Sequence, residues 1–182
     1  MKNNNMVDEA IEFATQAHSG QFRKGTKIPF IVHPMEVFSI VARMTDKSEV
    51  WAAAILHDVV EDCEDVTIEQ IRDRFGDYVA FLVASESEDK SLSWKERKQI
   101  TIDRTGRQPM DVKFIAMADK LSNIRSVSHD YFEVGDELWQ RFRMKDKAMQ
   151  GWYYKGMCES LKSLSEYAEY QEFCRLVSKV FD

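Results

Sequence analysis

The chain has 182 residues, of which 44% are hydrophobic and 31% are charged, and these values are ordinary for one globular domain with a sizeable core. Its net charge of −6 argues against a general nucleic-acid binder, because phosphate contacts dominate that affinity. No apolar run approaches the ~20 residues that span a membrane and the N-terminus lacks the apolar stretch of a signal peptide, so we expect a cytoplasmic protein that binds neither nucleic acid nor membrane.

Helical periodicity predicts an all-α fold with a single domain over residues 1–182, because seven glycines and three prolines leave long uninterrupted stretches. The first helix is expected over residues 7–17. A basic loop that contains two glycines follows it at residues 20–30. Pro34 suits the first turn of the next helix, which we expect to run towards Thr45.

Capping residues mark the helices that follow. Ser48 is a suitable N-cap for a helix that carries His57. Two segments with serine or threonine followed three residues later by Glu or Gln fit the capping box, at Thr67–Gln70 and Ser93–Glu96. Gly76 follows a polar helical stretch and is expected to end it.

The last third of the chain begins with a break at residues 105–110. The apolar run that follows, at residues 113–125, changes to polar residues at Asp119, so we expect a helix that ends near this aspartate. Residues 138–167 read as one long helical stretch rich in aromatic side chains, which are expected to pack in the core.

Three cysteines are present, at Cys63, Cys158 and Cys174. Their odd number and the lack of paired spacing argue against a disulfide framework. Cys63 directly follows an acidic cluster.

The acidic cluster is the main chemical feature of the sequence. Residues 52–62 read AAAILHDVVED, an apolar run that continues into one histidine and three carboxylates. On a helix, residues three and four apart share a face, so His57, Asp58, Glu61 and Asp62 would converge at the end of one helix. A buried carboxylate is retained when it is paired or bound to a metal, and a divalent cation would explain the cluster.

Two ligands on one helix are too few for a metal site, so further ligands must come from elsewhere. The chain has four histidines in all, and His33 lies just before the proline that begins a helix. Asp119 ends a second apolar run. His33, His57, Asp58 and Asp119 form a plausible four-ligand set for a cation that accepts imidazole and carboxylate. The alternative is a hydrogen-bonded His–Asp pair without a metal.

Three segments in the same order resemble the HD-superfamily hydrolases, in particular the alarmone hydrolase domain of the RelA/SpoT family and its stand-alone Mesh1-like small alarmone hydrolases. They read HSGQFRKGTKIPFIVHPMEV, AAAILHDVVEDCEDVTIEQIRDRFGDYV and KFIAMADKLSNIRSV. The resemblance extends from about Ala10 to Leu161 and implies an HD-domain helical fold. Phe30 departs from the family, which usually has tyrosine there.

The resemblance also implies roles for individual residues. By it, His33, His57, Asp58 and Asp119 are the metal ligands, and the metal is typically Mn²⁺. Glu61 and Asp62 match the catalytic acidic pair. The residues that match the family's substrate contacts are Arg23, Lys24 and Asn123.

The activity that the resemblance implies is the metal-dependent removal of the 3′-pyrophosphate from a guanosine alarmone such as ppGpp, with a small-molecule nucleotide as the partner. Two alternatives remain open at this point: a nucleotide phosphatase or phosphodiesterase, including an NADPH 2′-phosphatase, and a sensor that binds a nucleotide without turnover. The acidic pair disfavours the sensor. The sequence contains no phosphate-binding GxxxxGK[ST] loop, no GxGxxG fingerprint and no GxSxG elbow, which argues against those enzyme classes.

Overall fold

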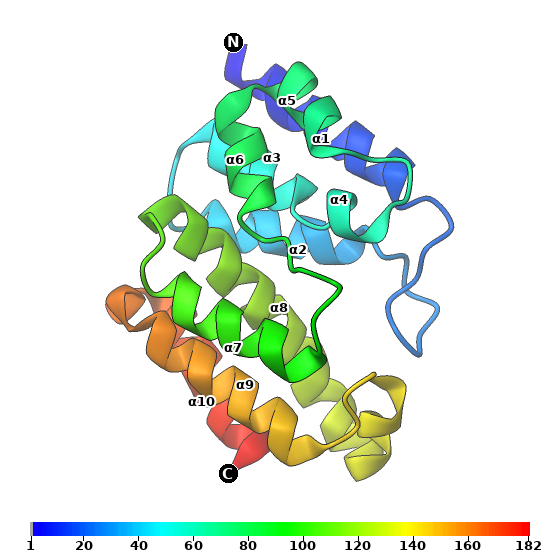
Figure 1. Ribbon diagram of the computed structural model, residues 1–182, viewed down its shortest axis with the longest axis vertical. Coiled ribbons are helices and arrows are strands. Elements are labelled where there is room, and N and C mark those ends of the chain that lie inside the picture. The colour runs from blue at the N-terminus through cyan, green and yellow to red at the C-terminus, as the bar shows by residue number, and fades with distance from the viewer. Residues whose placement is uncertain (1) are drawn as a thin grey trace. The chain divides into compact units, whose positions relative to one another are not determined.

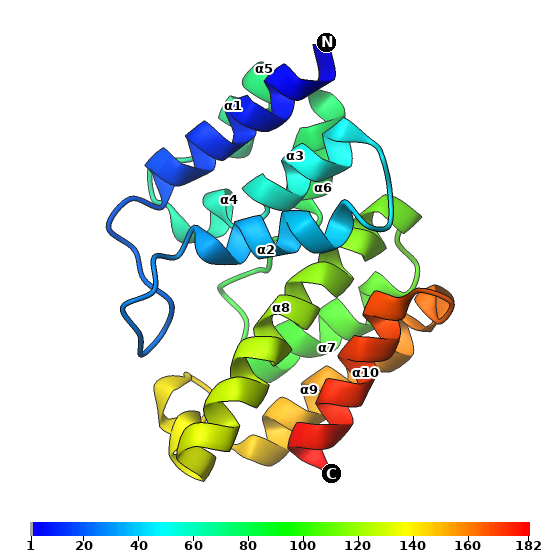
Figure 2. The same cartoon turned by 180° about the vertical axis from the view of Figure 1, so that it is seen from behind.

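The computed structural model describes residues 2–182, with side chains from residue 5 onwards (Figures 1 and 2). Its elements are helical, and the described residues contain no β-strand beyond one isolated bridge between Phe22 and Pro29. The predicted all-α class is therefore confirmed. None of the described helices is both long enough and apolar enough to cross a membrane, and the cytoplasmic location stays a prediction.

The described chain divides into two compact units. The first contains the residues up to Glu88 together with Met110–Ala118, and the second contains Asp89–Pro109 and Asp119–Asp182. The long helix α8 (Met110–Val134) contributes its first nine residues to the first unit and the rest to the second. The expectation of a single domain over the whole chain stays a prediction.

The first unit is built around one buried helix. Helix α3 (Ser48–Leu56) packs against α1 (Lys2–Ala17), α2 (Val32–Val41) and α6 (Asp77–Ala84). All five residues from Ala52 to Leu56 are fully buried, as expected for a helix that is apolar all round. The alanines among them let the neighbouring helices approach closely, so the segment that leads into the acidic cluster is held on several sides.

Helix ends in this unit agree with the predicted caps except at α3. Helix α5 (Ile68–Phe75) begins with the capping box at Thr67 and ends at Gly76, whose φ of 91° is favourable only for glycine. The predicted Ser48 cap is wrong. Ser48 is the first residue of α3, the extended residue before it is Lys47, and the Ser48 hydroxyl donates to the Glu49 carboxylate.

The second unit packs α9 (Lys147–Ser160) against α7 (Trp94–Thr105) and α10 (Ala168–Phe181). The capping box predicted at Ser93 begins α7. Gly156 of α9 allows the close approach to α7, because a Cβ atom there would lie 2.5 Å from Ile102 Cδ1.

The single long helix predicted over residues 138–167 is wrong. The structure has α9 flanked by two 3₁₀ helices, η1 (Gly135–Arg141) and η2 (Lys162–Leu164). Asp146 begins α9 by accepting hydrogen bonds from two backbone amides, those of Ala148 and Met149. An N-cap bond of this kind satisfies amides that a continuous helix would pair with carbonyls.

Candidate metal centre

The first unit brings two histidines and one aspartate together. His33 lies in the first turn of α2, and His57 and Asp58 form the turn between α3 and α4 (Val59–Asp62). Asp58 Oδ2 lies 3.4 Å from His33 Nε2 and 3.2 Å from His57 Nε2. One candidate ligand atom from each residue lies within 4.8 Å of the other two, a spacing that one cation can bridge.

The orientation of His57 suits a metal ligand. Its Nδ1 lies 2.8 Å from the carbonyl oxygen of Ala54, and only an N–H can donate to a carbonyl. Nδ1 therefore carries a hydrogen, and this bond turns Nε2 towards Asp58. Metal-binding histidines commonly fix their second nitrogen in this way.

Burial and charge also favour a cation at this point. The side chains of His33 and His57 are each 1% exposed, whereas that of Asp58 is 23% exposed, so solvent reaches the group from the aspartate side. Burial raises the pKa of the Asp58 carboxyl, but the imidazoles of His57 and His33 outweigh that effect and hold the pKa well below its ordinary value. The carboxylate is thus kept in the charged form that binds a metal.

The donor set fits a divalent cation. Two imidazole nitrogens and one carboxylate oxygen are ligands that Zn²⁺, Mn²⁺ and Fe²⁺ accept. Three protein ligands leave positions for water and substrate, as in catalytic metal sites. The His33–His57–Asp58 group is therefore a candidate divalent metal centre, and the alternative of an isolated His–Asp pair does not account for the second histidine.

The prediction that the acidic cluster continues one helix is wrong. Helix α3 ends at Leu56, and the chain passes through a turn at His57 and Asp58 before α4 begins. Neighbouring residues of a continuous helix point about 100° apart. The turn instead directs both adjacent side chains to one point, because His57 Nε2 and Asp58 Oδ2 lie 3.2 Å apart.

Glu61 and Asp62 end the short helix α4. Glu61 is half-buried and Asp62 is exposed, and among the described residues neither belongs to the group of ligand atoms at His33. Gln21 Nε2 donates to the main-chain carbonyl of Asp62 over 3.0 Å. The end of α4 is therefore tied to the loop that follows α1.

The sequence analysis did not identify the residues that hold α4 against the loop after α1, which are His18, Gln21 and Cys63. The side-chain oxygen of Gln21 lies 2.8 Å from Nδ1 of His18, which is 3% exposed. The Cys63 thiol donates to the carbonyl of Ala17 over 3.3 Å, and burial raises the pKa of this thiol. A polar pair three residues apart just after an amphipathic helix, His18 and Gln21, was the available signal in the sequence.

The basic loop before α2 is a tight turn. The Arg23 amide donates to the carbonyl of Ile28 over 2.9 Å, next to the Phe22–Pro29 bridge. Arg23 is half-buried, with its guanidinium carbon 5.9 Å from the centre of the Phe30 ring, and Lys24 is exposed.

The Phe30 ring links this loop to the metal centre. Its centre lies 5.9 Å from that of the His33 ring and 4.6 Å from that of the His18 ring. The one position at which the chain departs from the family's tyrosine is therefore in contact with a candidate ligand.

Asp119 and Asn123 belong to the second unit. Asp119 is buried in the middle of α8 rather than at a helix end as predicted, because α8 continues to Val134. Its carboxylate accepts from the Lys120 ammonium and, over 2.5 Å, from the Asn123 amide. The roles of Asp119 as a ligand and of Asn123 in substrate binding stay predictions.

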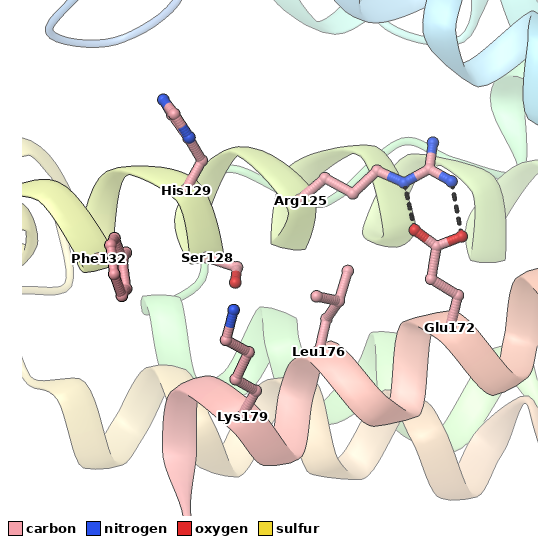
Figure 3. Close-up of a pocket in the computed structure, with 7 residues that line it drawn as sticks. All are labelled: Arg125, Ser128, His129, Phe132, Glu172, Leu176 and Lys179. Carbon is pink, nitrogen blue, oxygen red and sulfur yellow. Dashed lines mark hydrogen bonds and ion pairs between the residues drawn. The ribbon is translucent and has the colours of Figure 1, made fainter.

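A pocket of about 440 Å³ lies between α8 and α10 in the second unit (Figure 3). Arg125 and Glu172 form a two-bond ion pair at one end, with N–O distances of 2.8 and 2.7 Å. None of the predicted site residues lines this pocket; those that do are Arg125, Ser128, His129, Phe132, Glu172, Leu176 and Lys179.

Comparisons with known proteins agree with the candidate metal centre. The sequence profile of the HD domain matches residues 10–145. The guanosine-3′,5′-bis(diphosphate) 3′-pyrophosphohydrolase MESH1 of Xenopus tropicalis is 32% identical over 162 residues, which cover 80% of this chain and 89% of that protein. The human protein of the same name is 31% identical and covers 86% of this chain and 83% of its own length.

Two solved structures are similar throughout. Protein lmo0812 from Listeria monocytogenes has a TM-score of 0.75 at 38% identity and covers 82% of this chain and 98% of its own. A metazoan SpoT orthologue, described as hydrolysing ppGpp, has a TM-score of 0.79 at 26% identity and covers 96% of this chain and 94% of its own. The chain belongs to the HD domain family, within the group of hydrolases that includes the MESH1 proteins.

Proposed function

We propose that this protein is a metal-dependent 3′-pyrophosphohydrolase of ppGpp, which it converts to GDP and pyrophosphate. The observation that carries the proposal is the His33–His57–Asp58 group, because its two imidazoles and one carboxylate suit a catalytic cation. The relatives named for this reaction support the substrate.

The proposed ligand set is His33, His57, Asp58 and Asp119, and the proposed metal is Mn²⁺. A divalent cation bound here would lower the pKa of a coordinated water and polarise a phosphoryl oxygen. Asp119 is included on the strength of the family resemblance alone. Its carboxylate would have to exchange at least one of its bonds to Lys120 and Asn123 to serve as a ligand.

The proton transfers are assigned to Glu61 and Asp62. One carboxylate would take a proton from the attacking water, and the other would give a proton to the ribose 3′-oxygen as its bond to phosphorus breaks. Both lie within one short turn of Asp58 along the chain, and Asp62 is exposed to solvent. The division of these two roles is left open, since neighbouring carboxylates share their protons.

Substrate binding is assigned to Arg23, Lys24 and Asn123. The exposed Lys24 offers a compact charge for a phosphate, and Arg23 offers either a planar fork for phosphate or a surface for stacking on a base. Binding groups concentrate in loops held by rigid elements, and the Phe22–Pro29 bridge holds this loop.

The test is a product assay on the purified full chain with Mn²⁺, comparing ppGpp, NADPH and a simple phosphomonoester. We expect equal amounts of GDP and pyrophosphate from ppGpp and much slower turnover of the other two. His57→Ala should abolish the activity, and His129→Ala, which alters an exposed histidine outside the cluster, is the matched control. Preferred release of phosphate from NADPH or from the monoester would replace the alarmone with that substrate class.

A further inference from the structure

The two cysteines of the second unit lie side by side. Cys158 is in the last turn of α9 and Cys174 is in the middle of α10, and these helices run next to each other in both views (Figures 1 and 2). Tyr170, four residues before Cys174 and on the same face of α10, is hydrogen-bonded to the main-chain carbonyl of Cys158, and the two thiols are close enough for each to shift the pKa of the other. Each side chain is half-buried, so a small reagent can reach the pair while the helices hold it together.

Their surroundings make the two thiols unequal. The neighbouring Cys158 thiol and Tyr170 hydroxyl lower the pKa of the Cys174 thiol to about 7, against the opposing effects of burial and of the Glu159 charge. The neighbouring Cys174 thiol, together with burial, raises the pKa of Cys158. The Tyr170 hydroxyl also donates to the main-chain carbonyl of Cys158 over 2.9 Å, which ties α10 to α9 at this point.

We propose that Cys158 and Cys174 are a reversible oxidation site, at which a hydroperoxide such as hydrogen peroxide converts the two neighbouring thiols into an intrachain disulfide. Cys174 is the attacking residue and Cys158 the resolving residue. A redox-sensing cysteine typically has accessible thiolate character and a resolving cysteine beside it. The proposal does not depend on the hydrolytic activity.

The chemistry balances in two steps. The Cys174 thiolate attacks one peroxide oxygen, the O–O bond breaks, and a sulfenic acid and one water form after proton uptake. The Cys158 sulfur then attacks the Cys174 sulfur, the S–O bond breaks, and a second water leaves. Two thiols are oxidised to one disulfide and one hydrogen peroxide is reduced to two waters.

Cys63 provides an internal comparison. It lies in the first unit, its thiol donates to the Ala17 carbonyl, and burial raises its pKa. Cys63 has neither a lowered pKa, which would favour the reactive thiolate, nor a second cysteine in its unit that could resolve an oxidised sulfur, so it should stay reduced while the pair in the second unit is oxidised.

The experiment treats the purified full chain with hydrogen peroxide and measures thiol content and intact mass. We expect two of the three cysteines to become inaccessible to a maleimide, with a loss of about 2 Da and recovery on reduction. Non-reducing peptide mapping should join the peptides that contain Cys158 and Cys174. Cys63→Ser should give the same mass change, whereas Cys158→Ser should lose it and accumulate oxidised Cys174 instead.

Three outcomes would overturn the proposal. One is a cross-link that contains Cys63, the second is a disulfide between two chains, and the third is the absence of the mass loss while Cys174 oxidises further to the sulfinic acid. Peptide mapping of the peroxide-treated chain without any substitution distinguishes these outcomes, so the test holds even if a variant fails to fold.

Discussion

Replacement of Gln21 by alanine tests whether the end of α4 is held in place by the loop after α1. In the structure the amide of Gln21 donates to the Asp62 carbonyl over 3.0 Å, and its oxygen lies 2.8 Å from Nδ1 of His18. Gln21→Ala removes both contacts without touching a candidate metal ligand or an acidic side chain. Its effect should therefore be on position and stability rather than on metal content.

The magnitude follows from the burial of the two partners. Water can replace Gln21 at the carbonyl of the exposed Asp62, so that bond contributes at most the usual ~0.5–1.5 kcal/mol. His18 is 3% exposed, and leaving its ring N–H without an acceptor costs about 1–3 kcal/mol. The contact of 3.6 Å between this nitrogen and the Cys63 sulfur offsets only part of that loss. We expect a total destabilisation of ~1–3 kcal/mol, or about 2–12 °C in Tm for a chain of this size.

The effect on catalysis should be smaller than that of removing a proton donor. If the full free energy of the hydrogen bond from Gln21 to Asp62 stabilises the transition state, the loss of ~1.4 kcal/mol lowers kcat by about tenfold. The assays are urea unfolding followed by circular dichroism, pyrophosphate release and metal content. Gln16→Ala is the matched control, because Gln16 is exposed on α1 and surface changes stay within about 0.5 kcal/mol.

Two results would refute this reasoning. If Gln21→Ala unfolds like the control, the contacts to His18 and Asp62 do not stabilise the fold. If instead kcat falls by the ~10²–10⁴-fold typical of a lost proton-transfer group while stability is unchanged, Gln21 acts in the chemistry itself and not by holding α4.

Four further outcomes are expected. His57→Ala should abolish metal retention while preserving most of the helicity, and undiminished metal stoichiometry would remove His57 from the ligand set. Glu61→Gln should lower kcat by ~10²–10⁴-fold with the metal retained, and near-normal turnover would exclude it from proton transfer. The double variant Arg23→Ala, Lys24→Ala should raise KM for ppGpp far more than it alters metal affinity, and unchanged kinetics would show that the loop does not bind the substrate. Alkylation of Cys174 should rise as the pH passes through about 7, because the thiolate forms above that pKa, and a half-point at or above the ordinary thiol value of about 8.5 would contradict the effect of the neighbouring Cys158 and Tyr170.

Local sequence was sufficient for features that depend on a few neighbouring residues. Both capping boxes, at Thr67 and Ser93, formed as predicted, because the serine or threonine and its partner three residues later satisfy each other's backbone amides. Gly76 ended α5 because its φ of 91° excludes other residues. Ser48 failed as a cap because the extended backbone at Lys47 starts the helix one residue earlier.

The turn at His57 and Asp58 could not be predicted in the same way. No glycine or proline marks it, and Leu56, His57 and Asp58 are all compatible with a helix. The turn coincides with a local hydrogen bond from His57 Nδ1 to the carbonyl of Ala54 three residues earlier, a side-chain alternative to the helical backbone pattern that residue spacing alone does not reveal. Sequence analysis therefore selected three residues that the structure brings together, His33, His57 and Asp58, but on the assumption of a continuous helix that the chain does not form.

The sequence also did not predict that Cys158 and Cys174 are neighbours. The odd number of cysteines and their lack of paired spacing argued against a disulfide framework, and Cys63 lies in the first unit whereas Cys158 and Cys174 lie in the second. A reactive pair requires only two thiols, and their approach depends on how α9 and α10 face each other, which helical periodicity along the chain does not reveal. The helix predicted over residues 138–167 did not include the end of α9 at Ser160, so nothing in that prediction brought Cys158 and Cys174 together.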